Sequence, residues 1–250
     1  GRLPGDGRRR RLNVAVCDAA AVEPDAAIVI LLAAGAGRRL GGAEPKALLP
    51  IGGRPILAVA AAAAAAAPPI NGLVVTFPPG WEGRARACVE DLGIDIRFVE
   101  GGETRQDSVR TALATVPTSA EFVAVHDAAR PFAPPDLFTR VVHGLGGADG
   151  AVPVLAVADT VLRVRDDAVE GVESREELVL GQTPQAFRTT ALREAHAKAE
   201  AAGAAFTDDA SMLRWAGYEV RAVPGDPENM KITTLADLAY ADRRMGTGGG

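Results

Sequence analysis

The stretch that decides the fold class of this chain is LLAAGAGRRLGGAEPKALLPIGGRPIL, residues 31–57. A short apolar run leads into a glycine-rich basic turn, which a Pro-Lys pair follows. Gly35 and Gly37 lack Cβ atoms, so backbone N–H groups there can approach an anion closely. Positive charge comes to the same loop from Arg38, Arg39 and Lys46. The segment therefore predicts a site for the triphosphate of a nucleotide.

Two common phosphate-binding motifs fit this turn poorly. A dinucleotide fold needs a third glycine in G-x-G-x-x-G, and Leu40 stands at that position. A Walker loop needs Gly-Lys-Ser/Thr, whereas Lys46 follows Pro45, nine residues after Gly37. The spacing disfavours both a Rossmann dinucleotide site and a P-loop.

Composition favours a small ligand and a reducing compartment. A chain of 250 residues with 48% hydrophobic content can bury the core of one large α/β domain. A net charge of −5 gives no support to binding of nucleic acid. Cys17 and Cys88 are too far apart for a C-x-x-C site or a disulfide framework, which fits the cytoplasm. The alanine-rich run at 56–67 is too short to span a membrane and predicts a helix.

The chain divides into three parts by composition. Residues 1–26 predict a disordered leader. The arginine run Arg8–Arg11 could begin a signal peptide or a nucleic-acid-binding arm, but Asp18 interrupts the apolar stretch that follows after only a few residues. Residues 27–243 predict a single domain, and the glycine-ending segment 244–250 predicts a flexible tail.

Apolar runs alternate with helical patterns through the predicted domain, which indicates a mostly parallel sheet with helices on both faces. The predicted strands are 27–34, 72–77, 94–99, 121–126, 149–157 and 218–223. The predicted helices are 55–67, 82–92, 105–115, 135–144, 188–202, 208–216 and 234–244. Right-handed crossovers would place the strand ends, and the site, at one edge of the sheet.

Residues 156–180 break this alternation. Two alternating segments flank Asp166-Asp167, which predicts a protruding β-hairpin arm with the aspartates at its tip. An arm of this kind has little core of its own, so we expect it to pack on a second subunit.

Five motifs in order along residues 27–243 carry a family resemblance. The glycine-rich basic turn is followed by GGETRQDSV at 101–109, HDAARPF at 126–132, TPQAF at 183–187 with TDDAS at 207–211, and GDPENMKITT at 225–234. Together they resemble the 2-C-methyl-D-erythritol 4-phosphate cytidylyltransferases, CTP-using nucleotidyltransferases of the non-mevalonate isoprenoid pathway. The resemblance implies a Rossmann-like fold of the nucleotide-diphospho-sugar transferase type, transfer of a cytidylyl group with release of pyrophosphate, and a homodimer.

The resemblance also implies roles for individual residues. Arg39, Lys46 and Lys231 would be catalytic, stabilising the charge of the reacting phosphates. CTP would be bound by Ala33, Ala34, Gly35, Ala36, Gly37, Gly102, Glu103, Ser108, Ala128 and Arg130. The acceptor polyol phosphate would be bound by Asp127, Thr160, Arg175 and Thr207, with Arg175 reaching the neighbouring subunit's site. Mg²⁺ would be held by Asp127 and chiefly by the substrate phosphates.

Several polar residues have simpler structural interpretations. His126 is expected to be a packed, hydrogen-bonded histidine more than a general base. His143 and His196 have no third ligand nearby and are assigned to surface or core. Asp107, Asp208 and Asp209 are expected at helix starts, where the helix dipole favours acids. Arg105 and Arg110 are expected on a solvated helix face, and Arg38 either braces the turn or points to solvent.

Two rival functions remain open. Ribitol-5-phosphate cytidylyltransferase has similar motifs and differs in the shape of its acceptor. A catalytically silent nucleotide-binding module should have lost charge at the site, but Arg39, Lys46, Asp127, Arg175 and Lys231 are all present.

Overall fold

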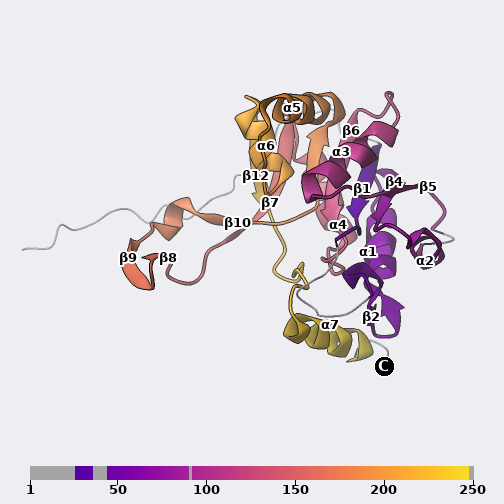
Figure 1. The fold of residues 1–250 in the computed structure, drawn as a ribbon, viewed down its shortest axis with the longest axis horizontal. Helices are drawn as coiled ribbons and strands as arrows, with labels where there is room; N and C mark the ends of the chain where they lie inside the picture. Colours follow the sequence, from indigo (N-terminus) through magenta and orange to yellow (C-terminus); the bar gives the residue numbers. More distant parts are fainter. Residues whose placement is uncertain (1–25, 36–43, 90–91, 248–250) are drawn as a thin grey trace, which may run out of the picture.

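The computed structural model describes residues 26–35, 44–89 and 92–247. An eight-stranded sheet forms the centre of this part of the chain, with strands in the order β10-β7-β11-β6-β1-β4-β5 and β12 paired to β7. Its strands are β1 (Ala27–Leu32), β4 (Ile70–Phe77), β5 (Asp95–Glu100), β6 (Phe122–Asp127), β7 (Gly150–Ala156), β10 (Val179–Gly181), β11 (Gln185–Arg188) and β12 (Val220–Pro224). The predicted α/β class is confirmed (Figure 1).

Pairing in the sheet is mostly parallel, as predicted. β1 pairs in parallel with β4 and β6, β4 with β5, and β7 with β12. β10 and β11 run antiparallel to their neighbours, and the sequence patterns did not predict either strand. β11 has four residues, too few for a period-2 pattern to stand out.

Two layers of helices cover the sheet. Alternate residues of β1 serve the two layers: Val29 and Leu31 pack on one side, and Ile30 on the other. The first layer contains α1 (Ile56–Ala65), α2 (Glu82–Cys88) and α4 (Pro135–His143). The second contains α3 (Arg105–Thr115), α5 (Thr189–Ala202) and α6 (Asp209–Trp215).

The alanine-rich run forms a core helix and not a linker. In α1 the fully buried residues include Leu57, Ala60, Ala61 and Ala64, spaced as one helical face. Alanine has the highest helix propensity, and Pro55 at the N-cap suits the start of the helix. The predicted helix is confirmed, although it ends at Ala65 and not at 67.

α7 (Leu235–Thr247) builds a separate small core below the sheet. Its Ala241 packs with Ile51, Ile56 and Ile232, beside the short ladder of β2 (Pro50–Ile51) and β3 (Arg54–Pro55). The helix continues beyond its predicted end at 244. The prediction of a flexible tail is therefore wrong for residues 244–247, which are helical. The predicted leader at 1–26 lies almost wholly outside the described residues.

The predicted hairpin arm stands away from the body (Figure 1). β8 (Leu162–Arg165) pairs with β9 (Ala168–Val172) and with no strand of the main sheet among the described residues. Asp166 and Asp167 form its tip with φ of 47° and 65°, the left-handed conformation that two-residue hairpin turns require. The arm ends earlier than predicted, because β10 returns to the main sheet on β7.

No helix among the described residues is long and apolar enough to cross a membrane.

Candidate active site

A cavity of about 740 Å³ opens where β1, β4, β5 and β6 end. The carboxyl ends of these parallel strands lie at one edge, since Leu32 is in register with both Thr76 and Asp127. A volume of this size suits a nucleotide-sized ligand. Nine predicted site residues line it: Ala33, Ala34, Gly35, Lys46, Gly102, Glu103, Ser108, Asp127 and Lys231.

Two lysines meet at this cavity from opposite ends of the chain. Lys231 Nζ donates to Asp127 Oδ2 at 2.6 Å. Lys46 Nζ donates to the backbone carbonyl of Ile232 at 3.0 Å, so it is tied to the residue next to Lys231. Lys46 belongs to a 3-10 turn (Lys46–Leu48) whose Ala47 and Leu48 are buried, which fixes the direction in which the lysine leaves the core. The two predicted catalytic lysines are thus brought together.

Asp127 lies between two cations at the end of β6. Its Oδ1 accepts from Arg105 Nε at 3.2 Å, while Oδ2 accepts from Lys231. Its backbone N–H donates to Thr183 Oγ1 at 3.0 Å. Burial alone would raise the pKa of Asp127, but Arg105 and Lys231 outweigh it and hold that pKa well below its usual range. The carboxylate is therefore charged at neutral pH.

The surroundings of Arg105 differ from the prediction. We expected it on a solvated helix face, yet it is half-buried and bridges Asp127 to Asp209, with Nη1 to Asp209 Oδ2 at 2.6 Å. Arg110 does lie on the exposed face, where it pairs with Asp107 and Glu200. Arg105 precedes Arg110 by more than a helical turn, at the cavity end of α3, which explains their different surroundings.

The two acids before α6 also differ from each other. Asp208 is the N-cap and accepts from Ser211 N at 2.9 Å, as expected for a helix start. Asp209 is 2% exposed and pairs with Arg105, so it is more than a first-turn acid. His196 lies in the core beside it, with Nε2 at 3.7 Å from Asp209 Oδ1.

The turn before α3 forms one cavity wall. Thr104 and Asp107 make a reciprocal capping box that starts the helix. Ser108 Oγ accepts from Gly102 N at 3.1 Å and donates to the Thr104 carbonyl at 2.9 Å. A Cβ on Gly101 would lie 2.2 Å from the Ala34 Cβ, so this wall needs glycine to meet the β1 turn.

His126 is a structural histidine, as favoured from the sequence. It is fully buried, with Nε2 at 3.1 Å from the Arg130 carbonyl and Nδ1 at 3.1 Å from Thr183 Oγ1. Burial lowers the pKa of His126 to about 4. It is thus neutral at pH 7 and does not line the cavity.

We expect this histidine to make stability depend on pH. Its pKa in the folded protein, about 4, lies below the ordinary histidine value of about 6.5, so the unfolded chain binds more protons between these values. The contribution is complete above pH ~6.5 and is lost as the pH falls to ~4, amounting to roughly 3 kcal/mol. Urea unfolding across this range should show a shallower pH slope in His126→Gln than in the parent, and equal slopes would contradict the assignment.

Ala128 and Arg130 hold segments that lead to the cavity. The Ala128 N–H donates to the Leu32 carbonyl at 3.1 Å, which joins β6 to the end of β1. Arg130 Nη1 donates to the Asn229 carbonyl at 2.8 Å and so holds the segment before Lys231. Neither residue lines the cavity, although both were predicted as CTP contacts.

Three predicted acceptor residues lie outside this cavity in the single chain. Thr160 and Arg175 are exposed on the arm, where Arg175 Nη1 donates to the Ala158 carbonyl at 2.7 Å. Thr207 is exposed in the segment that precedes α6. The predictions for Ala36, Gly37, Arg38 and Arg39 fall outside the described residues.

The described residues contain no group of three or more metal-ligating side chains. Asp127 binds Lys231 at the cavity, and both of its oxygens already accept from cations. Mg²⁺ in nucleotide sites is usually held by one or two carboxylates together with substrate phosphates and water. The donor set fits a metal carried by a nucleotide, and does not fit a cage built by the protein.

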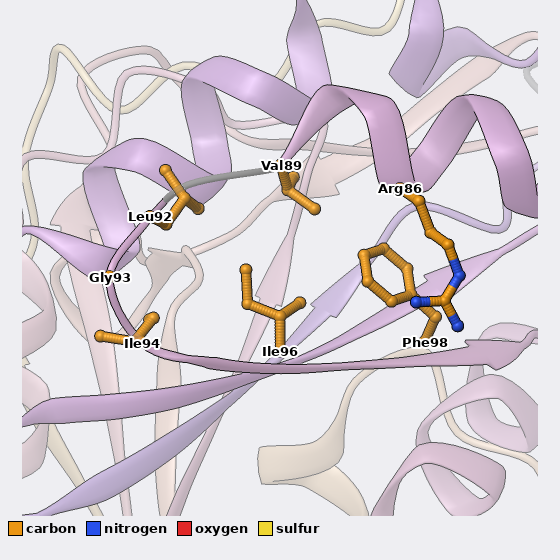
Figure 2. A pocket seen from close by; sticks show the side chains of 7 residues that line it. All are labelled: Arg86, Val89, Leu92, Gly93, Ile94, Ile96 and Phe98. Carbon is orange, nitrogen blue, oxygen red and sulfur yellow. The ribbon is translucent and has the colours of Figure 1, made fainter.

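A second hollow, of about 390 Å³, lies between α2 and β5 (Figure 2). Its lining is apolar apart from Arg86, whose guanidinium lies 4.3 Å from the centre of the Phe98 ring. It brings together no acid, base or nucleophile among the described residues, so the polar cavity is the candidate active site.

Comparison with known proteins gives a consistent family. The model described as "IspD: 2-C-methyl-D-erythritol 4-phosphate cytidylyltransferase" matches residues 27–247. A 2-C-methyl-D-erythritol 4-phosphate cytidylyltransferase of Deinococcus radiodurans is 42% identical over 217 residues, covering 87% of this chain and 88% of that protein. A bifunctional IspD/IspF enzyme of Nitratidesulfovibrio vulgaris is 46% identical over 224 residues, covering 86% of this chain and 57% of that protein. The chain thus spans little more than half the length of the bifunctional relatives.

Solved structures agree with the fold. The 2-C-methyl-D-erythritol 4-phosphate cytidylyltransferase of Thermus thermophilus superimposes with a TM-score of 0.73 at 37% identity, over 87% of this chain and 98% of that chain. The 4-diphosphocytidyl-2C-methyl-D-erythritol synthase of Anaerococcus prevotii gives a TM-score of 0.78 at 27% identity, over 89% of this chain and 99% of that chain.

Proposed function

The chain belongs to the 2-C-methyl-D-erythritol 4-phosphate cytidylyltransferase (IspD) family, and we propose from this membership that it makes 4-diphosphocytidyl-2-C-methyl-D-erythritol and pyrophosphate. CTP and 2-C-methyl-D-erythritol 4-phosphate are the substrates, and the product serves isoprenoid precursor synthesis. One observation carries the proposal: Lys46, Lys231 and Asp127 converge on a cavity walled by the family's motifs.

The reaction is an in-line displacement at phosphorus. An oxygen of the acceptor phosphate forms a bond to the α-phosphorus of CTP, and the bond from that phosphorus to the β-bridging oxygen breaks, releasing pyrophosphate. Both reactants are anions, so the site must neutralise crowded negative charge more than it must move a proton. Lys46 and Lys231 supply that charge, and we assign Arg39 to the same task on the triphosphate.

Base selection belongs to the turn at 101–108. The Ser108 hydroxyl is engaged within the turn by Gly102 N and the Thr104 carbonyl, so we assign it the role of shaping the wall. The turn and Ala33–Gly35 both line the cavity. We propose that they bind the edge of a pyrimidine and exclude the larger purines by size.

We expect Gly101→Ala to weaken CTP binding. The new Cβ would displace Ala34 from the cavity wall, and overpacking of this kind costs about 1–3 kcal/mol, so the KM for CTP should rise about 5- to 150-fold if that cost falls on CTP binding. Gly83→Ala is the matched control, since a Cβ there meets nothing within 4 Å. Equal KM values in the parent and both variants would remove the turn from the CTP site.

Asp127 and the substrate phosphates would hold Mg²⁺, which would neutralise charge on the leaving pyrophosphate.

Homodimerisation through the arm is supported by the arm's exposed apolar side chains. Leu162, Val164, Val169 and Val172 are each between 46% and 68% exposed, and a two-stranded hairpin with no core of its own needs a partner to bury such side chains. We propose that a second copy covers them and receives Thr160 and Arg175 at its acceptor site, with Thr207 contributing from the body. A guanidinium fork and hydroxyls suit a phosphate monoester that carries vicinal hydroxyls.

We assign the enzyme to the cytoplasm, because two cysteines far apart in the sequence suit a reducing compartment.

The direct test pairs each of CTP, UTP, ATP and GTP with methylerythritol phosphate, ribitol 5-phosphate or no acceptor, in the presence of Mg²⁺. We expect pyrophosphate release with CTP and methylerythritol phosphate. Turnover with ribitol 5-phosphate alone would assign the rival activity, and no turnover with any pair would favour a silent nucleotide-binding module.

A further inference from the structure

Arg105 connects three separate segments at the edge of the candidate site. It is the first residue of α3, directly after the turn at 101–104 that forms a cavity wall. Its Nε reaches Asp127 at the end of β6, 3.2 Å away, and its Nη1 reaches Asp209 in the first turn of α6, 2.6 Å away. Both of these carboxylates are buried, which distinguishes the pairing from that of Arg110, whose carboxylate partners are much more exposed.

Asp209 is a fixed anchor for the guanidinium. Its side chain is 2% exposed and lies inside the core formed by α5 and α6. Burial would raise its pKa, but Arg105 and His196 lower it, so Asp209 is charged at neutral pH. The Arg105 nitrogen that bonds neither carboxylate, Nη2, is buried with no hydrogen-bond partner among the described residues. The guanidinium is therefore committed to the two carboxylates.

Asp127 is oriented by this arrangement. Arg105 holds Oδ1, which turns Oδ2 toward the Lys231 ammonium at 2.6 Å. The contact of each Asp127 oxygen with a different cation fixes the rotamer of this carboxylate. The fixed carboxylate in turn sets the position of the Lys231 ammonium. A buried ion pair is weak grounds for a role in stability, since desolvation offsets most of the attraction.

We propose that Arg105 is a positioning residue, anchored on Asp209, that sets the orientation of Asp127 and through it the position of the Lys231 ammonium. This inference rests on the proposed function, in which Lys231 stabilises the reacting phosphates. Arg105 would also link the base-selecting turn to the phosphate end of the site, because it directly follows that turn and binds Asp127.

The test compares Arg105→Gln and Arg105→Lys with Arg110→Gln, which changes an exposed arginine on the same helix. Arg105→Gln should lower kcat by about 10- to 100-fold, the scale for a misplaced catalytic group, with a smaller change in the KM for CTP. Arg105→Lys keeps the charge but lacks the fork, so it should recover only part of kcat. Arg110→Gln should match the parent.

Two readouts separate positioning from a merely structural role: a loss in kcat with little change in the KM for CTP in Arg105→Gln, and the partial recovery of kcat in Arg105→Lys.

Crystal structures of the parent and of Arg105→Gln give a readout independent of turnover. We expect the Asp127 side chain to turn and its contact with the Lys231 ammonium to be lost in Arg105→Gln. If the parent itself shows no turnover, the proposed function fails, while these structures still decide the inference. Parent-like kcat in Arg105→Lys together with an unchanged contact between Asp127 and Lys231 in Arg105→Gln would overturn it. If Arg105→Gln does not fold, parent-like kcat in Arg105→Lys alone overturns it.

Discussion

Lys46→Ala and Lys231→Ala should each reduce the turnover number for pyrophosphate release by at least ~100-fold, the scale for losing one preorganised charge stabiliser. Lys231 bonds the Asp127 carboxylate at the cavity, and Lys46 bonds the carbonyl of Ile232, the residue that follows Lys231. Under the proposed mechanism, each variant removes a cation from a site that neutralises two polyanions. Steady-state kinetics at saturating CTP and acceptor measure the loss.

Lys198→Ala is the matched control for these two variants. Lys198 lies on α5, where its ammonium contacts the Ala216 carbonyl and the Tyr218 ring, and it does not line the cavity. It should turn over like the parent. Because Lys46 is held by the segment that carries Lys231, the double variant should lose less than the product of the two single losses. Near-parent rates in both single variants would eliminate the proposed mechanism.

Mixing two inactive variants should restore activity if the arm acts in trans. In a dimer of Arg175→Ala with Lys46→Ala, one site receives an intact Lys46 from its own chain and an intact Arg175 from its neighbour. Random exchange makes about half of the dimers mixed, each with one of two sites working, so about a quarter of the parent activity should return. Arg175 is exposed and outside the cavity of its own chain, which is why a partner site is expected.

The control for this experiment mixes Lys46→Ala with Lys231→Ala. Both lysines belong to the same chain's cavity, and the mixed dimer of these variants has no intact site. It should stay inactive. Absence of rescue in the Arg175 mixture, with dimers confirmed by sedimentation, would place Arg175 in its own chain's site or outside catalysis.

The central strands were predictable because burial on both faces leaves nearly continuous apolar runs. β1 reads AIVILL, and β6 reads FVAVHD with its polar residues at the end that meets the cavity. Helix starts were also predictable, since Asp107 lies in the first turn of α3 and Asp208 caps α6, as expected. β10 and β11 were missed, because short antiparallel strands at the arm's return carry too few residues for a pattern.

The role of Arg105 could not be predicted, because its partners are distant in sequence. Asp127 and Asp209 lie 22 and 104 residues away, and local patterns do not report such contacts. One signal was present: only one of the paired acids Asp208 and Asp209 can be the N-cap, which leaves the other for a different partner. The same limit applies to Lys46, whose contact with Ile232 spans 186 residues.

The most direct test of the proposed function follows the products by ³¹P NMR after CTP, methylerythritol phosphate and Mg²⁺ are mixed with the enzyme. We expect equal amounts of pyrophosphate and of a diphosphate diester, and no pyrophosphate when the acceptor is left out. Unchanged CTP in the complete mixture, or CMP and pyrophosphate formed without acceptor, would contradict the proposed function.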